Sequence, residues 1–211
     1  MSFHLPPIYP ITDIVLSGLS HAEQVEQLAA GGADLIQLRD KESSPREFYE
    51  QAVAAVAAAR RLHVRLVIND RVDIALAAGA DGVHLGQDDL SPAEARKLLG
   101  NNSIIGFSTH SIEQAKRAVE LPVDYIAIGP IFATRTKKNA EPAVGIEGLK
   151  AVRQAIDPMP LVAIGGINAE NIAEVLQNGA DSAAVISLLY NNGTSITVNF
   201  ERISRSTNSN Y

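Results

Sequence analysis

The sequence predicts an α/β protein that folds as a single (β/α)8 barrel of the TIM type. Short apolar runs alternate with longer amphipathic patterns along most of the chain, and the tripeptide Gly-Ala-Asp recurs just before three of the apolar runs. The chain has 211 residues, 46% of them hydrophobic, which is sufficient for one compact barrel with a buried core.

The predicted strands are short and mostly continuous in hydrophobicity, as expected of parallel strands covered on both faces. They are Ile8–Thr12, Leu35–Leu38, Leu66–Ile68, Gly82–His84, Ile104–Gly106, Tyr125–Ile128, Leu161–Ile164 and Ala183–Ile186. Alanine-rich segments between them, such as Pro45–Arg61, carry apolar residues at helical spacing.

The Gly-Ala-Asp repeat supports the count of eight strands. It occurs at Gly32–Asp34, Gly79–Asp81 and Gly179–Asp181, with a weaker copy ending at Asp124, and each interval accommodates two β/α units. Glycine ends a helix, and the small alanine allows a tight turn into the next strand. A doubly wound open sheet is the alternative, but its glycine-rich dinucleotide loop is missing where Thr12–Ile14 follow the first strand.

We assign residues 1–190 to the barrel and catalytic domain, and 191–211 to a polar tail. Half of the last 24 residues are Asn, Ser or Thr, which predicts a poorly ordered end. The absence of cysteine excludes disulfides and thiolate catalysis. A net charge of −6 argues against nucleic acid or membrane surfaces as partners, and no membrane span or secretory signal is evident. A cytoplasmic protein with small-molecule substrates is expected, and a homo-oligomer remains open.

The active site of such a barrel lies at the carboxyl ends of the strands. At the end of the second strand, Gln37 and Arg39 alternate by two and point to the same side, and Lys41 continues that spacing past the strand end. An inward amide with two cations suits an anionic substrate that has a heterocyclic part. A surface charge cluster is the alternative.

Carboxylates follow the third and fourth strands. Asp70 stands at one strand end and Asp89 in the next loop, and two carboxylates without a histidine cluster favour a hard cation such as Mg²⁺. Asp88 and Asp89 precede Ser91-Pro92, so one of them could instead cap a helix. His84 alone is more typical of a hydrogen-bonded structural residue than of a ligand or base.

The remaining strands predict a phosphate site. Ser108 ends the fifth strand, and a basic, hydroxyl-rich loop with Thr134, Thr136 and Lys137 follows the sixth, although a solvated charged loop would have the same composition. The pair Gly165-Gly166 follows the seventh strand and Ile186-Ser187 ends the eighth, which is where this fold usually binds phosphate.

Taken together, these motifs resemble those of thiamine-phosphate synthases. The resemblance runs from Tyr9–Asp13 to Ile186-Ser187. It is carried by Gln37–Lys41, Asn69-Asp70, His84–Asp89, Gly129-Pro130 with Thr134, Thr136 and Lys137, and Gly165–Ile167. The family joins 4-amino-5-hydroxymethyl-2-methylpyrimidine diphosphate to a thiazole phosphate, or its carboxylated form, and releases pyrophosphate.

The resemblance implies a role for each matched residue. Asp70 and Asp89 would hold Mg²⁺. The pyrimidine diphosphate would be bound by Gln37, Arg39, Lys41, Asn69, Ser108 and Lys137, of which Lys41, Ser108 and Lys137 are the expected catalytic residues. The thiazole phosphate would be bound by Thr134, Thr136, Gly166, Ile186 and Ser187. Replacing Lys137 or Asp89 with alanine is expected to lower turnover by orders of magnitude without unfolding the protein.

Three rival functions remain from sequence alone. A thiazole tautomerase of similar fold would not need the full set of Arg39, Lys41, Asp70, Asp89 and Lys137, all of which are present. A sugar-phosphate epimerase barrel would need several histidines and aspartates converging on one metal. A sensor of thiamine phosphates would have little need of a metal site for a leaving group.

Overall fold

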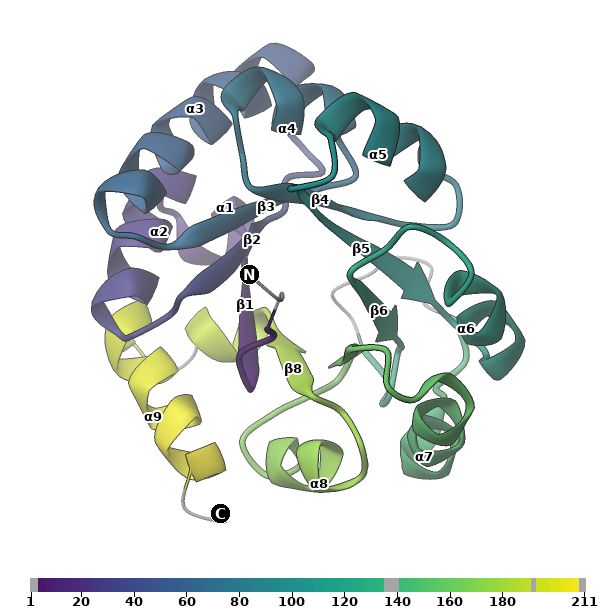
Figure 1. Cartoon of the computed structure of the whole chain (residues 1–211). Helices are drawn as coiled ribbons and strands as arrows, with labels where there is room; N and C mark the ends of the chain where they lie inside the picture. The colour runs from purple at the N-terminus through teal and green to yellow at the C-terminus, as the bar shows by residue number, and fades with distance from the viewer. Residues whose placement is uncertain (1–3, 135–140, 191–192, 209–211) are drawn as a thin grey trace.

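The computed structural model describes residues 4–134, 141–190 and 193–208. Within these residues, eight parallel strands form a closed barrel in sequence order (Figure 1). They are β1 (Ile8–Thr12), β2 (Leu35–Leu38), β3 (Arg65–Asn69), β4 (Gly82–Leu85), β5 (Ile104–Thr109), β6 (Tyr125–Ile128), β7 (Leu161–Ile164) and β8 (Ser182–Val185). The barrel closes where β1 pairs with β8, with Ile8 opposite Ala183. This closure confirms the predicted barrel and excludes the open sheet.

The helices surround the barrel as an outer layer (Figure 1). They are α1 (Ile14–Ser17), α2 (His21–Ala30), α3 (Pro45–Arg61), α4 (Val72–Ala78), α5 (Pro92–Leu99), α6 (Ile112–Ala118), α7 (Gly145–Ile156), α8 (Ile172–Gln177), the 3-10 helix η1 (Ser187–Tyr190) and α9 (Ile196–Asn208). Ser20 and Ser44 begin α2 and α3 with reciprocal capping hydrogen bonds to a glutamate three residues later. None of the helices in the described part of the chain is long and apolar enough to cross a bilayer.

The strands are buried on both faces, which explains their continuous hydrophobicity. Ile36 and Leu38 of β2 point outward into the apolar layer beneath the helices, whereas Leu35 packs inside the barrel with Tyr9 and Ile11 of β1. Alternation with period two therefore separates two cores, one around the barrel and one within it.

The aspartates of the Gly-Ala-Asp repeat have a structural role beyond the predicted turn. The carboxylates of Asp81, Asp124 and Asp181 accept a backbone N–H from the first or second residue of the preceding strand, at Leu66 (2.7 Å), Ile105 (2.7 Å) and Leu161 (2.8 Å) respectively. Each of these aspartates also donates its own N–H back to the carbonyl of the same residue. Each carboxylate thus satisfies a strand-end donor that the ladder leaves open.

This arrangement predicts that the loss of stability depends on which aspartate of the repeat is replaced. Asp124 also pairs with Arg96 at 2.8 Å, so Asp124→Ala removes an acceptor from both Ile105 and Arg96. We expect a loss of about 2 kcal/mol in the free energy of unfolding, measured by urea denaturation. Asp34→Ala is the matched control, because Asp34 bonds the next strand through its backbone carbonyl, which alanine retains. Equal losses in both variants would contradict this role.

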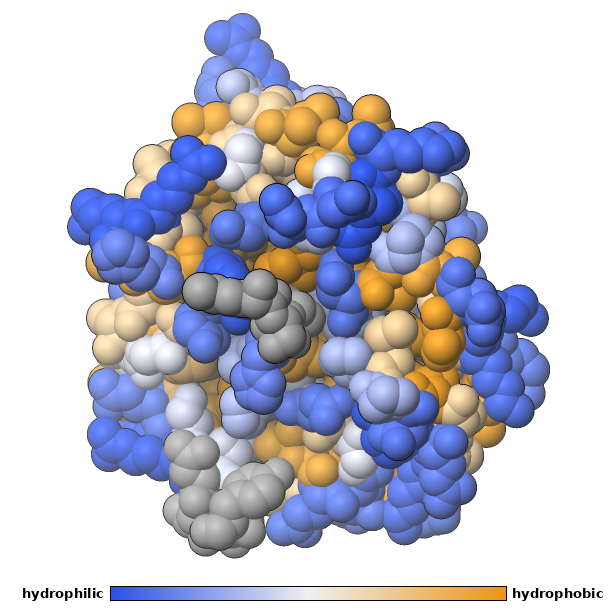
Figure 2. Space-filling view, in the orientation of Figure 1, coloured by the Kyte–Doolittle hydropathy of each residue, from blue (hydrophilic) through white to orange (hydrophobic). Residues whose placement is uncertain are grey.

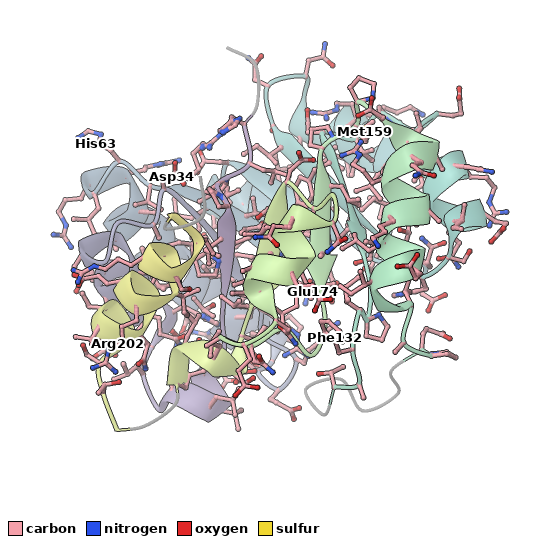
Figure 3. The ribbon with its side chains drawn as sticks, turned by 90° about the horizontal axis from the view of Figure 1, so that it is seen from below. Asp34, His63, Phe132, Met159, Glu174 and Arg202 are labelled. Atoms are coloured by element: carbon pink, nitrogen blue, oxygen red, sulfur yellow. The ribbon has the colours of Figure 1, made fainter. Side chains whose placement is uncertain are left out.

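The amino and carboxyl ends of the strands lie at opposite ends of the barrel. In the side view of Figure 3, Asp34 and Met159, which precede β2 and β7, lie at one end, and Phe132, which follows β6, lies at the other. On the face shown in Figure 2, hydrophilic residues lie along most of the outline and hydrophobic residues lie between them. Leu5, which is buried, packs with the inner core, so the amino end of the barrel is filled.

The C-terminal segment differs from the expectation of a poorly ordered tail. Residues Ile196–Asn208 form α9, which buries Ile196, Phe200 and Ile203. The Thr197 hydroxyl donates to the carbonyl of Gln27 (2.9 Å), which ties α9 to α2. The eighth outer position is therefore covered by a full helix after η1.

Candidate active site

A cavity of about 570 Å³ opens at the carboxyl ends of the strands. Its lining includes every predicted site residue that the structure describes, namely Gln37, Arg39, Lys41, Asn69, Asp70, Asp89, Ser108, Thr134, Gly166, Ile186 and Ser187. The other two predicted residues, Thr136 and Lys137, lie outside the described residues. A single cavity therefore brings together side chains that are up to 150 positions apart in the sequence (Gln37 and Ser187).

The end of β2 delivers an amide and two cations to this cavity. Gln37 is buried, whereas Arg39 pairs with Asp13 at 3.4 Å and the Lys41 ammonium pairs with Asp70. All three residues line the cavity, which agrees with the inward placement predicted from their spacing, although the Lys41 side chain is half exposed. The two cations are held by acidic partners that a more negatively charged ligand could displace.

Asp40, between the two cations, shapes the loop that carries them. Its Oδ1 atom accepts the backbone N–H groups of Glu42 (3.0 Å) and Ser43 (2.9 Å), which turns the chain after β2. These hydrogen bonds keep the pKa of Asp40 below its usual value despite its burial. An ionised Asp40 therefore helps to fix the direction in which Arg39 and Lys41 leave the strand.

Two carboxylates face each other across the ends of β3 and β4. Burial raises the pKa of Asp89, and the neighbouring Asp70 carboxyl raises it further, against the opposing effects of the Gly86 N–H and the Lys41 ammonium. The Asp89 Oδ2 atom accepts that N–H at 2.6 Å. A divalent cation bound between the two side chains would favour the ionised form of Asp89.

Asp70 and Asp89 are hard oxygen donors of the kind that could hold Mg²⁺. Among the described residues no cluster of three or more His, Cys, Asp or Glu side chains could enclose a metal. Mg²⁺ needs only one or two protein carboxylates because it keeps waters and takes phosphate oxygens. Ser91, whose side chain accepts from Glu94 N–H, caps α5, so Asp89 is not needed as the helix cap. Asp70 has φ +62°, an uncommon left-handed conformation that turns it out of the strand end.

A network of polar side chains inside the barrel forms the floor of the cavity. The hydroxyls of Tyr9 and Tyr125 are 3.1 Å apart, Tyr125 contacts Nδ1 of His84 at 3.0 Å, and Nε2 of His84 contacts Ser108 at 2.8 Å. Burial raises the pKa of Tyr9 to about 12 and lowers that of His84 to about 4, so all three rings are neutral near pH 7. His84 is thus hydrogen-bonded as predicted, whereas the sequence assigned no role to Tyr125.

The depressed pKa of His84 predicts an acid-dependent loss of stability. Between about pH 6.5 and pH 4 the unfolded chain binds a proton at this ring and the folded chain does not, so unfolding is favoured as pH falls. The free energy of unfolding should decrease by up to about 3 kcal/mol across this window, with His21, also shifted downward by burial, adding to it. His84→Gln should flatten the dependence in urea unfolding followed against pH. An unchanged slope in that variant would contradict the assignment.

The opposite side of the cavity presents backbone rather than charge. Gly165 and Gly166 follow β7 with φ +101° and +66°, and the Asn171 side chain donates to the carbonyl of Gly166 at 3.1 Å. A Cβ atom at Gly166 would lie 2.7 Å from the Ala133 carbonyl oxygen. Glycine is therefore required for the loop after β7 to pack against the loop after β6, and the chain here can approach a ligand closely.

His110, at the start of the loop after β5, is held by the backbone. Its ring Nδ1 atom lies 2.6 Å from the carbonyl oxygen of Gly129, and its backbone N–H donates to the side-chain oxygen of Gln114. Nδ1 therefore carries the proton, because a carbonyl can only accept. This geometry links the loop after β5 to the end of β6 on the cavity wall.

Comparison with known proteins gives a consistent result. Residues 8–189 match the family described as "Thiamine monophosphate synthase". The chain is similar to the thiamine-phosphate synthase of Syntrophomonas wolfei (50% identity over 183 residues, 86% of this chain and 87% of that protein) and to that of Chloroflexus aurantiacus (48% over 181 residues, 85% and 83%). It also resembles the solved structure of thiamine phosphate pyrophosphorylase from Pyrococcus furiosus, with a TM-score of 0.84, 35% identity, and coverage of 96% and 95%.

Proposed function

The chain belongs to the thiamine monophosphate synthase family and is a transferase of thiamine biosynthesis, and we propose that it joins 4-amino-5-hydroxymethyl-2-methylpyrimidine diphosphate to 4-methyl-5-(2-phosphoethyl)thiazole. The products are thiamine monophosphate and pyrophosphate. The carboxylated thiazole phosphate is an alternative form of the second substrate. The observation that carries the proposal is that the cationic and carboxylate-bearing strand ends share one cavity with the glycine loop after β7.

The diphosphate fits the side of the cavity formed by β2, β3 and β4. Arg39 and Lys41 supply positive charge there, and Asn69 supplies an amide at the end of β3. Asp70 and Asp89 would hold Mg²⁺ against the diphosphate oxygens. Lys41 is paired with Asp70 and can turn to a phosphate oxygen once a cation takes its place on the carboxylate.

The proposed reaction is a substitution at the methylene carbon of the pyrimidine. The C–O bond to the diphosphate breaks first, its electron pair leaves with pyrophosphate, and the aminopyrimidine ring delocalises the positive charge on the carbon. The thiazole nitrogen then forms the new C–N bond. Bound Mg²⁺ would supply charge neutralisation for the leaving group. Arg39 and Lys41 stabilise the same developing charge, and the cavity holds the two rings in line, so neither a strong base nor a protein nucleophile is needed.

The thiazole phosphate fits the other side of the cavity. Gly166 offers close backbone approach, and Ile186, Ser187 and Thr134 line the adjoining wall. Thr136 and Lys137, which follow Thr134 in the sequence, are proposed to complete this site and to grip the diphosphate from the same loop. Ser108 and Gln37 remain on the cavity floor, where they would contact the pyrimidine.

A coupled assay tests this proposal directly. Purified protein is given both substrates with and without Mg²⁺, and pyrophosphate and thiamine monophosphate are measured together. Equal amounts of the two products, formed only with the metal, are the expected result. Folded protein that forms neither product would refute the proposed function, and products formed equally well with a chelator present would refute the role of Asp70 and Asp89.

A further inference from the structure

Five polar side chains from five different strands form one hydrogen-bonded chain through the barrel, here called the interior relay. Gln37 donates to the Tyr9 hydroxyl (3.3 Å), which contacts the Tyr125 hydroxyl (3.1 Å). Tyr125 contacts Nδ1 of His84 (3.0 Å), and Nε2 of His84 contacts Ser108 (2.8 Å). All five residues also line the cavity, so both ends of the relay are available to a ligand.

One direction of donation runs through the relay from Gln37 to Ser108. An amide nitrogen can only donate, so Tyr9 accepts from Gln37, and its one hydroxyl hydrogen can then be donated to Tyr125. The Tyr125 hydrogen is then directed to Nδ1 of His84, which places the ring proton on Nε2, where it is donated to the Ser108 oxygen. The Ser108 hydrogen is left for the cavity. In the reverse direction Ser108 would donate to Nε2 of His84, and the ring proton would lie on Nδ1 and be donated to Tyr125.

Close packing holds the relay in place. The rings of His84 and Tyr125 stack with centroids 5.5 Å apart, and Tyr125 meets Tyr9 edge-on at 5.9 Å. A Cβ atom at Gly106 would lie 2.3 Å from the Tyr125 hydroxyl and 2.5 Å from Nδ1 of His84. The relay therefore occupies space that any other residue at position 106 would fill. Buried polar groups fixed in this way specify one arrangement.

We propose that His84, Tyr125 and Tyr9 are positioning residues that present the Ser108 hydroxyl as a hydrogen-bond donor and the Gln37 amide oxygen as an acceptor. The site then selects a heterocycle that offers an acceptor atom to Ser108 and an N–H donor to Gln37. An aminopyrimidine has both, since its ring nitrogens accept and its exocyclic amine donates. This inference rests on the proposed function. It adds to that function the residues that determine which hydrogen-bonding edge of the pyrimidine is recognised.

The tautomer of His84 tests the direction of the relay without any substrate. Protein labelled with ¹⁵N-histidine is examined by NMR, and the His84 signals are identified by their loss in His84→Gln. A proton on Nε2 with a bare Nδ1 is the expected result, and Tyr125→Phe, which removes the hydrogen donated to Nδ1, should weaken that preference. A proton on Nδ1 in the wild-type protein would overturn the proposal, because the relay would then run toward Gln37.

A double-mutant cycle tests whether His84 acts through Ser108. His84→Leu and Ser108→Ala should each lower kcat/KM for the pyrimidine diphosphate by about ten- to a hundredfold, with KM for the thiazole phosphate unchanged. The double variant should be no worse than Ser108→Ala alone, and His84→Gln, which retains a donor, should recover part of the loss. Effects that multiply would overturn the proposal. Absence of synthase activity in the wild-type protein would refute the proposed function instead, and the tautomer measurement would still test the relay.

Discussion

Asp89→Ala is expected to lower kcat by about a thousandfold or more while the protein remains folded. Asp89 is one of the two carboxylates that we propose hold Mg²⁺, and losing one of these ligands would remove several kcal/mol of stabilisation from the departing diphosphate. Stability should not fall with activity. Burial and the adjacent Asp70 already disfavour the Asp89 carboxylate, so its removal relieves an unfavourable interaction even though the Gly86 N–H loses its acceptor.

The matched control is Asp88→Ala. Asp88 is the preceding carboxylate in the same loop and is exposed, and it lines the cavity, so this variant makes the same change of net charge. Turnover within about threefold of wild type is expected for the control. The measurements are kcat at saturating Mg²⁺, the Mg²⁺ concentration for half-maximal activity, and urea unfolding of each variant. Similar losses of activity in the two variants would mean that the change of net charge, and not the loss of a metal ligand, causes the effect.

Most of the fold could be predicted because each strand is marked by a short apolar run in its own part of the sequence. Buried on both faces, β1, β2, β6 and β7 have the bounds expected from their apolar runs. Strand β5 continues to Thr109, three residues past the predicted end, because Ser108 and Thr109 are polar residues with partners inside the sheet and the interior relay. Hydrophobicity alone does not distinguish such residues from the start of a loop.

The C-terminal helix was not predicted, because the polar composition of the tail indicated a poorly ordered segment. Asn, Ser and Thr dominate the tail, yet Ile196, Phe200 and Ile203 recur at helical spacing and form the buried side of α9. That spacing of three and four residues was the available signal. The surrounding polar residues are tolerated because α9 packs against α2, η1, α8 and β1, and this tertiary packing rather than helix propensity stabilises it.

The candidate site was predictable in its parts but not in its connections. Strand-end position identified Arg39, Asp70 and Gly166, since the carboxyl ends of parallel strands meet at one face. The relay from Gln37 to Ser108 could not be read in the same way, because it depends on side chains from five strands meeting in the barrel interior. Tyr9 was within reach of sequence reasoning, as it alternates with Ile8 and faces inward with Ile11.

Gly166→Ala is the second variant for which we expect a large effect. It tests whether position 166 matters because the backbone closely approaches the phosphate or because its backbone conformation is strained for other residues. A methyl group at position 166 would lie 2.7 Å from both the Ala133 carbonyl oxygen and the Phe132 Cβ atom, so the loop after β6 must move. Thr134 lies in that loop and lines the side of the cavity that we propose for the thiazole phosphate. We expect KM for the thiazole phosphate to rise by about a hundredfold, with KM for the pyrimidine diphosphate little changed.

Gly145→Ala provides the control, because Gly145 also has a left-handed backbone, φ +72° against +66°, but open space around its Cβ position. Both variants should lose about 1 kcal/mol of stability from the conformational strain that a Cβ atom brings at positive φ. Only Gly166→Ala should impair binding of the thiazole phosphate. If both variants raised that KM equally, strain transmitted through the helix and loop would account for the effect, and Gly166 would lose its assignment as the point where the backbone approaches the phosphate.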